Sequence, residues 1–211
     1  MEDEFGGLNI DPDVLERNVC GCKVCQVHCA VMPSFLIPED VVPYMHATGF
    51  FDEASQGDGD EAVFSIEDLI PWAETNLLAS DGTYVRVPDS DKVVQIPTLV
   101  PASRRNGSCV MFNQKSRLCA VHEAAPFGCR MFSCSMDGDR AKGLSSFAAA
   151  RLAKMWDNIE NTEPEGVSME EGLYASIWLE LDKSGHKRKR TTMALRKKVE
   201  KAIDKIRKEE E

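Results

Sequence analysis

The sequence contains no run of about 18 apolar residues, so we expect no helix that spans a membrane. Its first residues, MEDEFGGLNIDPDVLERN, lack the basic start and the apolar stretch of a secretory signal, which predicts a cytoplasmic chain without a membrane partner. The common signatures of nucleotide-binding loops, serine hydrolases and zinc proteases are missing as well. We therefore assign no catalytic residue, and whether the protein is an enzyme stays open at this point.

Positive charge is scarce outside the C-terminal end. The chain has 25 Lys/Arg and 35 Asp/Glu, a net charge of −10, yet residues 186–211 hold eleven Lys/Arg against five Asp/Glu. An acidic body repels nucleic acid, and only the tail with its HKRKR stretch could attract it. That tail mixes acids and bases at helical spacing without interleaved aromatic residues, so we interpret HKRKR as the solvated start of a helix and disfavour nucleic-acid binding.

The hydrophobic pattern predicts an α+β fold that is mainly helical, a compact domain stabilised by metal. We expect helices over 38–49, 65–80, 144–160 and 168–182, with Ser65 and Ser168 as N-caps, and a small β-hairpin formed by 83–87 and 92–100. Leu195, Val199, Ala202 and Ile206 recur at helical spacing and mark a C-terminal amphipathic helix, which offers a surface for a protein partner. The predicted division is residues 1–183 for a cysteine-cluster metal-binding domain and 184–211 for a basic, mixed-charge helix.

All eight cysteines fall in two short windows, NVCGCKVCQVHC at residues 18–29 and CVMFNQKSRLCAVHEAAPFGCRMFSC at residues 109–134, with 79 cysteine-free residues between them. A reducing cytosol argues against a disulfide framework. One nucleophilic cysteine would leave seven unexplained, and buried thiols scattered through a core would not cluster in this way. The clustering favours a metal, and we expect the two windows to converge on one or two metal sites.

Cys22 and Cys25 form a C-x2-C pair, whose spacing lets two sulfurs from one turn reach a single ion, and tetrahedral zinc then needs two more ligands. The order C-x2-C-x3-C in the first window is the reverse of the radical-SAM motif, and a bacterial ferredoxin motif does not fit either. An iron–sulfur cluster assembled from both windows stays open, so the expected cofactor is zinc or iron. The candidate metal ligands are Cys20, Cys22, Cys25, His28, Cys29, Cys109, Cys119, Cys129 and Cys134.

At these residues the chain resembles the YkgJ-type cysteine-cluster family of zinc- or iron-chelating domains. The stretch CKVCQVHC followed by FLIPEDV is similar to the first family signature, C-x2-C-G-x-C-C with a Pro/Thr-Glu-Asp helix start. Cys22, Cys25 and Cys29 are in place, and His28 stands where the family has the first of two adjacent cysteines. The second window resembles the second signature at these positions: Cys109, Cys119, Glu123, Pro126, Cys129, Arg130 and Phe132. It departs at His122, Ala125 and Ser133, where the family has Tyr, Arg and Pro.

The resemblance covers about 50 of the 211 residues. It implies metal binding at one or two sites, and His122 becomes a further candidate ligand. Arg130, beside Cys129, is interpreted either as a charge that offsets the thiolates or as a partner in a plain surface salt bridge. Because related chains include a flagellin lysine methylase, the resemblance also permits a metal-dependent protein-modifying or redox enzyme as the alternative function.

Overall fold

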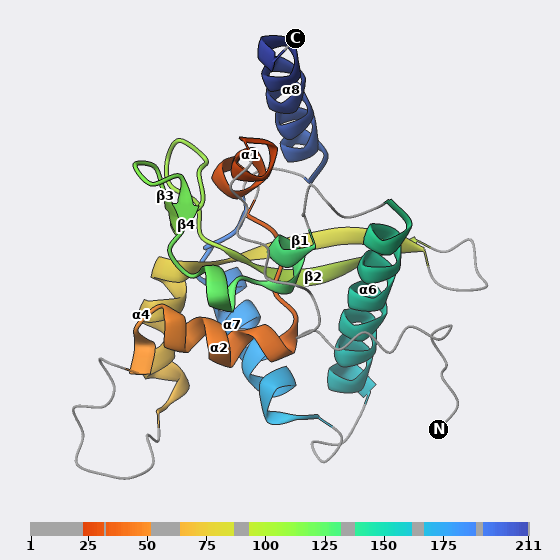
Figure 1. The fold of residues 1–211 in the computed structure, drawn as a ribbon. Coiled ribbons are helices and arrows are strands. Elements are labelled where there is room, and N and C mark those ends of the chain that lie inside the picture. Colours follow the sequence, from red (N-terminus) through yellow and green to blue (C-terminus); the bar gives the residue numbers. More distant parts are fainter. Residues whose placement is uncertain are drawn as a thin grey trace.

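The computed structural model describes residues 23–31, 33–51, 64–86, 93–131, 138–161, 167–188 and 192–210. Its helices are α1 (Lys23–Val31), η2 (Pro38–Asp40), α2 (Val41–Ala47), α4 (Ile66–Asn76), η3 (His122–Ala124), α5 (Phe127–Arg130), α6 (Gly138–Asn161), α7 (Met169–Lys183) and α8 (Thr192–Glu210). Its strands are β1 (Leu77–Arg86), β2 (Val93–Pro101), β3 (Phe112–Asn113) and β4 (Leu118–Cys119). The fold is α+β and mainly helical, as predicted, with antiparallel pairs β1–β2 and β3–β4 (Figure 1).

Two of the helices begin at the serines that the sequence predicts. In α4 the backbone N–H of Asp68 donates to Ser65 Oγ at 3.3 Å, and the N–H of Ser65 donates to the Asp68 carboxylate at 2.9 Å. Ser168 and Glu171 form the same reciprocal pair at the start of α7, at 3.2 and 2.9 Å. Each capping box satisfies N–H groups that have no partner within the helix. Both predicted N-caps are confirmed.

The hairpin is longer than predicted. Strand β1 begins at Leu77, whereas the sequence pattern predicted helix as far as Ser80, so that part of the prediction is wrong. Residues 77–80 pair instead with residues 98–101 of β2, and a bulge follows between Ser80 and Thr83. Tertiary pairing overrides helix propensity here, because Leu77 and Ala79 are buried in the core as strand residues.

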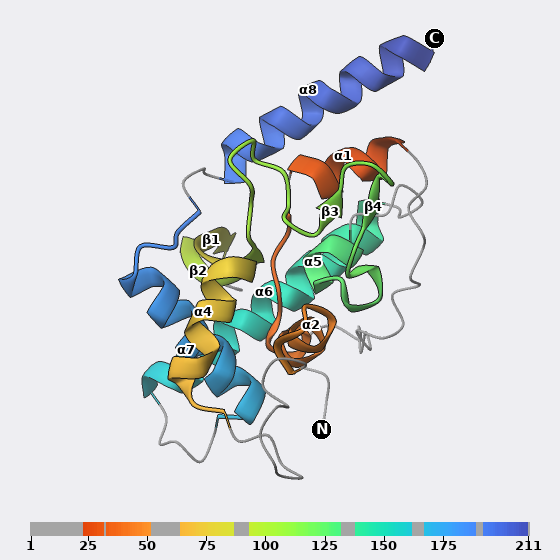
Figure 2. The same ribbon diagram turned by 90° about the vertical axis from the view of Figure 1, so that its left-hand side faces the viewer.

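The hairpin β1–β2 lies between helices (Figures 1 and 2). Its buried residues share one hydrophobic cluster with residues of α2, α4, α6 and α7. Tyr174 of α7 is fully buried; its hydroxyl accepts from the N–H of Leu99 at 2.8 Å and donates to the carbonyl of Leu36 at 3.0 Å. Leu36 in turn donates its N–H to the Leu99 carbonyl at 2.9 Å. The segment that follows α1 is therefore fixed to both the hairpin and α7.

The chain returns to the hairpin after α7. The N–H of Ala79 donates to His186 at 2.9 Å, and the N–H of Arg188 donates to Ala79 at 2.8 Å, so residues 186–188 run beside β1. Helix α8 then contacts α1 and buries Val199, while its far end projects from the body (Figure 2). Within the described parts of the chain, no helix combines the length and apolarity that a bilayer span requires.

Candidate functional site

Four of the predicted ligand cysteines are described with their side chains, and each comes from a different element. Cys29 lies in α1, Cys109 precedes β3, Cys119 ends β4, and Cys129 lies in α5. All four are free thiols. Figure 2 shows α1, β3, β4 and α5 on the same side of the molecule. The first cysteine window thus supplies one thiol to this group and the second window supplies three.

These thiols influence one another electrostatically. Burial raises the pKa of Cys29 to about 11, and the charges of Cys119 and Cys109 add to this effect. The pKa of Cys129 is raised well above its usual range by burial, and also by Cys109, Cys29 and Cys119. A thiolate disfavours a second thiolate only when the two are near neighbours in a partly buried environment. The four sulfurs therefore form one electrostatic group, although among the described residues no three Cys, His, Asp or Glu side chains have a metal-holding arrangement.

Backbone N–H groups of other residues point at three of the four sulfurs. Burial raises the pKa of Cys109 to about 11, and hydrogen bonds from the N–H groups of Met111 and Phe112 oppose this rise. Burial likewise raises the pKa of Cys119 against a hydrogen bond from the N–H of Val121. Cys129 Sγ accepts from the N–H of Ser34 at 3.4 Å. N–H donors stabilise negative charge on sulfur, as they do around sulfur-ligated metals.

Two arginines shape the loops that carry Cys109 and Cys119. Arg104 donates to the carbonyls of Cys109, Val110 and Phe112 at 2.7, 2.6 and 2.9 Å, which folds the chain back before β3. Arg117, at the turn between β3 and β4, has a φ of 61°. Its Nε donates to the Gln26 side chain at 3.3 Å and its guanidinium lies over the Phe112 ring. This contact joins the hairpin of the second window to the helix of the first.

Asp40 connects the segment that follows the first window to the second window. One carboxylate oxygen accepts from the N–H groups of Ile37 at 3.0 Å and Phe127 at 2.7 Å, and the other accepts from Arg130 at 2.8 Å. Asp40 thereby caps the starts of both η2 and α5, the short helix that holds Cys129. Burial raises the pKa of Asp40 to about 6, against the hydrogen bond from Ile37 and the charge of Arg130. Arg130 forms an ion pair, but not the surface salt bridge that the sequence suggested, because its side chain is 12% exposed and that of Asp40 is 6% exposed.

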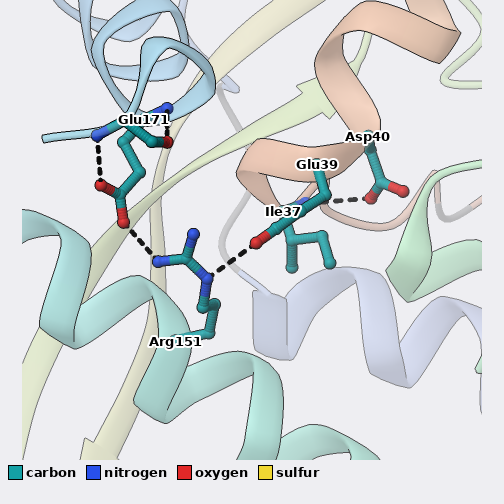
Figure 3. A network of polar contacts seen from close by, with 6 residues as sticks. Ile37, Glu39, Asp40, Arg151 and Glu171 are labelled. Carbon is teal, nitrogen blue, oxygen red and sulfur yellow. Dashed lines mark hydrogen bonds and ion pairs between the residues drawn. The ribbon is translucent and has the colours of Figure 1, made fainter. Parts of the chain in front are cut away.

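A partly buried network of ion pairs holds the same segment from the other side (Figure 3). Arg151 of α6 donates to Glu39 at 2.8 Å and also bonds Glu171, the residue that caps α7. The PED stretch that follows the first window is therefore anchored to α5 through Asp40, and to α6 and α7 through Glu39 and Arg151.

The remaining predicted ligands are less informative. Cys20, Cys22 and Cys134 lie outside the described residues, as does the side chain of Cys25, which stands one turn before Cys29 in α1. His28 is half-buried in α1, and burial lowers its pKa, which favours the neutral imidazole that a metal requires. His122 is half-buried in η3. Their participation in a metal site stays a prediction.

Sequence reasoning missed Arg188. It belongs to the HKRKR stretch, which we interpreted as the solvated start of the last helix. For Arg188 this interpretation is wrong, because its side chain is half-buried and donates to the carbonyl of Pro33. Arg188 also precedes the first residue of α8. Thiolates at Cys129 and Cys109 act on its charge. No periodicity distinguishes Arg188 from its basic neighbours, so only the fold reveals the difference.

Comparisons of the chain with models of known protein families, with curated proteins and with solved structures gave no match. The resemblance to the cysteine-cluster family therefore stays a prediction.

Proposed function

We propose that this protein binds a thiophilic metal ion, zinc or iron, through Cys29, Cys109, Cys119 and Cys129. The observation that carries the proposal is the mutual electrostatic influence of thiols from four elements and both cysteine windows. Four sulfur ligands are the number that tetrahedral zinc or an iron–sulfur cluster uses.

The electrostatics of the thiols support the same proposal. With pKa values near 11, Cys29 and Cys109 are protonated at neutral pH, since burial and neighbouring thiolates disfavour their charged forms. A bound cation reverses both penalties, because it displaces the protons and its charge offsets the repulsion between thiolates. The backbone donors to Cys109, Cys119 and Cys129 already point at the sulfurs and need no rearrangement to stabilise them.

The test begins with elemental analysis and visible spectroscopy on protein purified without oxygen. We expect about one zinc per chain in a colourless protein, or iron in a brown one whose visible absorption arises from sulfur-to-iron charge transfer. Protein that retains neither metal and takes up neither on reconstitution would contradict the proposal.

The ligand role is tested by Cys119→Ser, with Leu118→Ser as its matched control. Both substitutions place a serine in β4, and Leu118 is an exposed residue there. Removing one sulfur ligand should weaken metal binding by more than the 10–100-fold that changes behind the ligands typically cost. The control should retain its metal. Equal metal affinity in both variants, measured by competition with a chromophoric chelator, would remove Cys119 from the site.

A further inference from the structure

Arg188 reaches the thiol group from a part of the chain that contains no cysteine. Its backbone N–H donates to Ala79 at 2.8 Å, which fixes residue 188 beside β1. Its guanidinium points inward, and Nη2 donates to the carbonyl oxygen of Pro33. Lys187, the preceding residue, instead pairs with Asp182 of α7 and is exposed. Of these two neighbouring cations, Arg188 alone is directed at the segment behind Cys129.

The Pro33–Ser34 peptide carries hydrogen bonds at both ends. Its oxygen accepts from Arg188, and its N–H donates to Cys129 Sγ at 3.4 Å. Hydrogen bonds arranged in series polarise one another, and a charged donor strengthens the series. A guanidinium on the oxygen of this peptide therefore makes its N–H a better donor to sulfur.

The position of that peptide relative to α5 is tightly constrained. Gly128 donates its N–H to Phe35 at 3.0 Å, and a Cβ at residue 128 would lie 2.3 Å from Ser34 Oγ. Only glycine permits this close approach, which keeps the Ser34 N–H within reach of Cys129.

The electrostatics of the thiol group also indicate a role for Arg188. Burial lowers the pKa of Arg188 to about 10, against the opposite effect of negative charge on Cys129 and Cys109, and a guanidinium with this pKa is protonated at neutral pH. Arg130, although adjacent to Cys129 in the sequence, is paired with Asp40. A dication held by four thiolates has a net charge of −2, which a nearby buried cation partly offsets.

We propose that Arg188 is a positioning residue of the metal site: it orients the Pro33–Ser34 peptide toward Cys129 and supplies a positive charge behind the thiolates. This inference rests on the proposed metal binding. It assigns to the C-terminal segment a role in a site whose ligands lie in the two cysteine windows.

The experiment titrates the full-length apoprotein with Co²⁺, whose thiolate charge-transfer absorption reports sulfur ligation. Four proteins are compared: the wild type, Arg188→Met, Arg188→Lys and the matched control Lys187→Met. We expect about 10–100-fold weaker Co²⁺ binding for Arg188→Met, the usual cost of losing a group that orients a ligand. Arg188→Lys, which keeps the charge and loses the planar fork, should recover part of the affinity. Lys187→Met should match the wild type.

A second readout separates this role from general stability. The amide proton of Ser34, observed by NMR in the zinc-loaded protein, should have a different chemical shift in Arg188→Met than in the wild type, because its hydrogen bond to sulfur weakens. If the wild type takes up no Co²⁺, both the metal site and the role of Arg188 are refuted. If the wild type binds and Arg188→Met binds equally well with an unshifted Ser34 signal, the role of Arg188 alone is refuted. Should Arg188→Met fail to fold, Arg188→Lys decides, since wild-type affinity with an unshifted Ser34 signal would again refute that role.

Discussion

At the scale of single residues, the candidate site depends on polar groups that connect distant parts of the chain. Asp40 ties the segment after α1 to α5, and Arg117 ties the β3–β4 hairpin to α1. Ser34 and Arg188 act on Cys129 through one peptide unit. Each of these contacts joins residues that are far apart in the sequence, and together they hold the elements that carry the described thiols against one another.

The pH dependence of stability should reveal the burial of Asp40. Its pKa is about 6 in the folded protein against 3.8 in an exposed aspartate, so the folded state holds a proton that the unfolded state releases between these values. The protonated Asp40 therefore contributes about 3 kcal/mol to the free energy of unfolding. This contribution is fully present below about pH 4 and is lost as the pH rises through 6. Substitution by Asn removes this titration.

Urea unfolding of the wild type and Asp40→Asn at several pH values between 4 and 7 measures this contribution. The stability of the wild type relative to the variant should fall as the pH rises. Glu39→Gln is the control, because the adjacent Glu39 side chain is 42% exposed and its charge is the smallest of the influences on the Asp40 pKa, so most of the pH dependence of stability should persist in that variant. A wild-type advantage that grows with pH would mean that the fold prefers the ionised Asp40.

At the scale of elements, the sequence predicted the features that depend on interactions between neighbouring residues, such as the starts of helices. Ser65 and Ser168 begin helices as expected, because a capping box is contained within four residues. The sequence pattern predicted helix for residues 77–80, because nothing in these four residues indicates that they pair with a strand about twenty residues later. The clustering of cysteines predicted that the windows converge; the donors Ser34 and Arg188 were missed, because a single contact across the chain leaves no periodic trace.

The bulge in β1 provides a test of element geometry. Gly82 has a φ of +77°, and a Cβ there would lie 1.5 Å from the carbonyl oxygen of Ile96. Gly82→Ala should therefore destabilise the protein by at least about 2 kcal/mol, through both backbone strain and the collision with β2. The measurement is the free energy of unfolding in urea, taken with an unchanged slope against denaturant.

Gly172→Ala is the matched control for that substitution. Gly172 lies inside α7 with open space around the position of a Cβ. Alanine should stabilise a helix interior by about 0.5–1 kcal/mol relative to glycine. If Gly82→Ala proved as harmless as Gly172→Ala, the bulge would not have the described geometry.

At the scale of the whole molecule, the core and the thiol group are built differently. Leu99, Tyr174 and their neighbours form a hydrophobic cluster around β1–β2 and α7 that needs no metal to account for its packing. The four thiols lie on α1 and on short elements, namely α5, β4 and the turn before β3, and Phe127 of α5 belongs to a second, smaller hydrophobic cluster with Ile37 and Leu144. Small elements of this kind typically depend on a bound ion or a disulfide for order.

Metal removal should therefore loosen one part of the molecule more than the other. If the proposed site is occupied, chelation should speed hydrogen exchange at the amides of Met111, Val121 and Ser34, which donate to sulfur, while Leu99 beside Tyr174 stays protected. Exchange measured by NMR on metal-loaded and chelated protein tests this expectation. If exchange became equally fast at all these amides, the core would depend on the metal as much as the thiol loops do. This outcome is physically accessible, because the binding free energy of a structural zinc is comparable to the free energy of unfolding of an entire domain. Unchanged exchange at every amide, in protein shown by elemental analysis to have lost its metal, would mean that the ion contributes nothing to the fold.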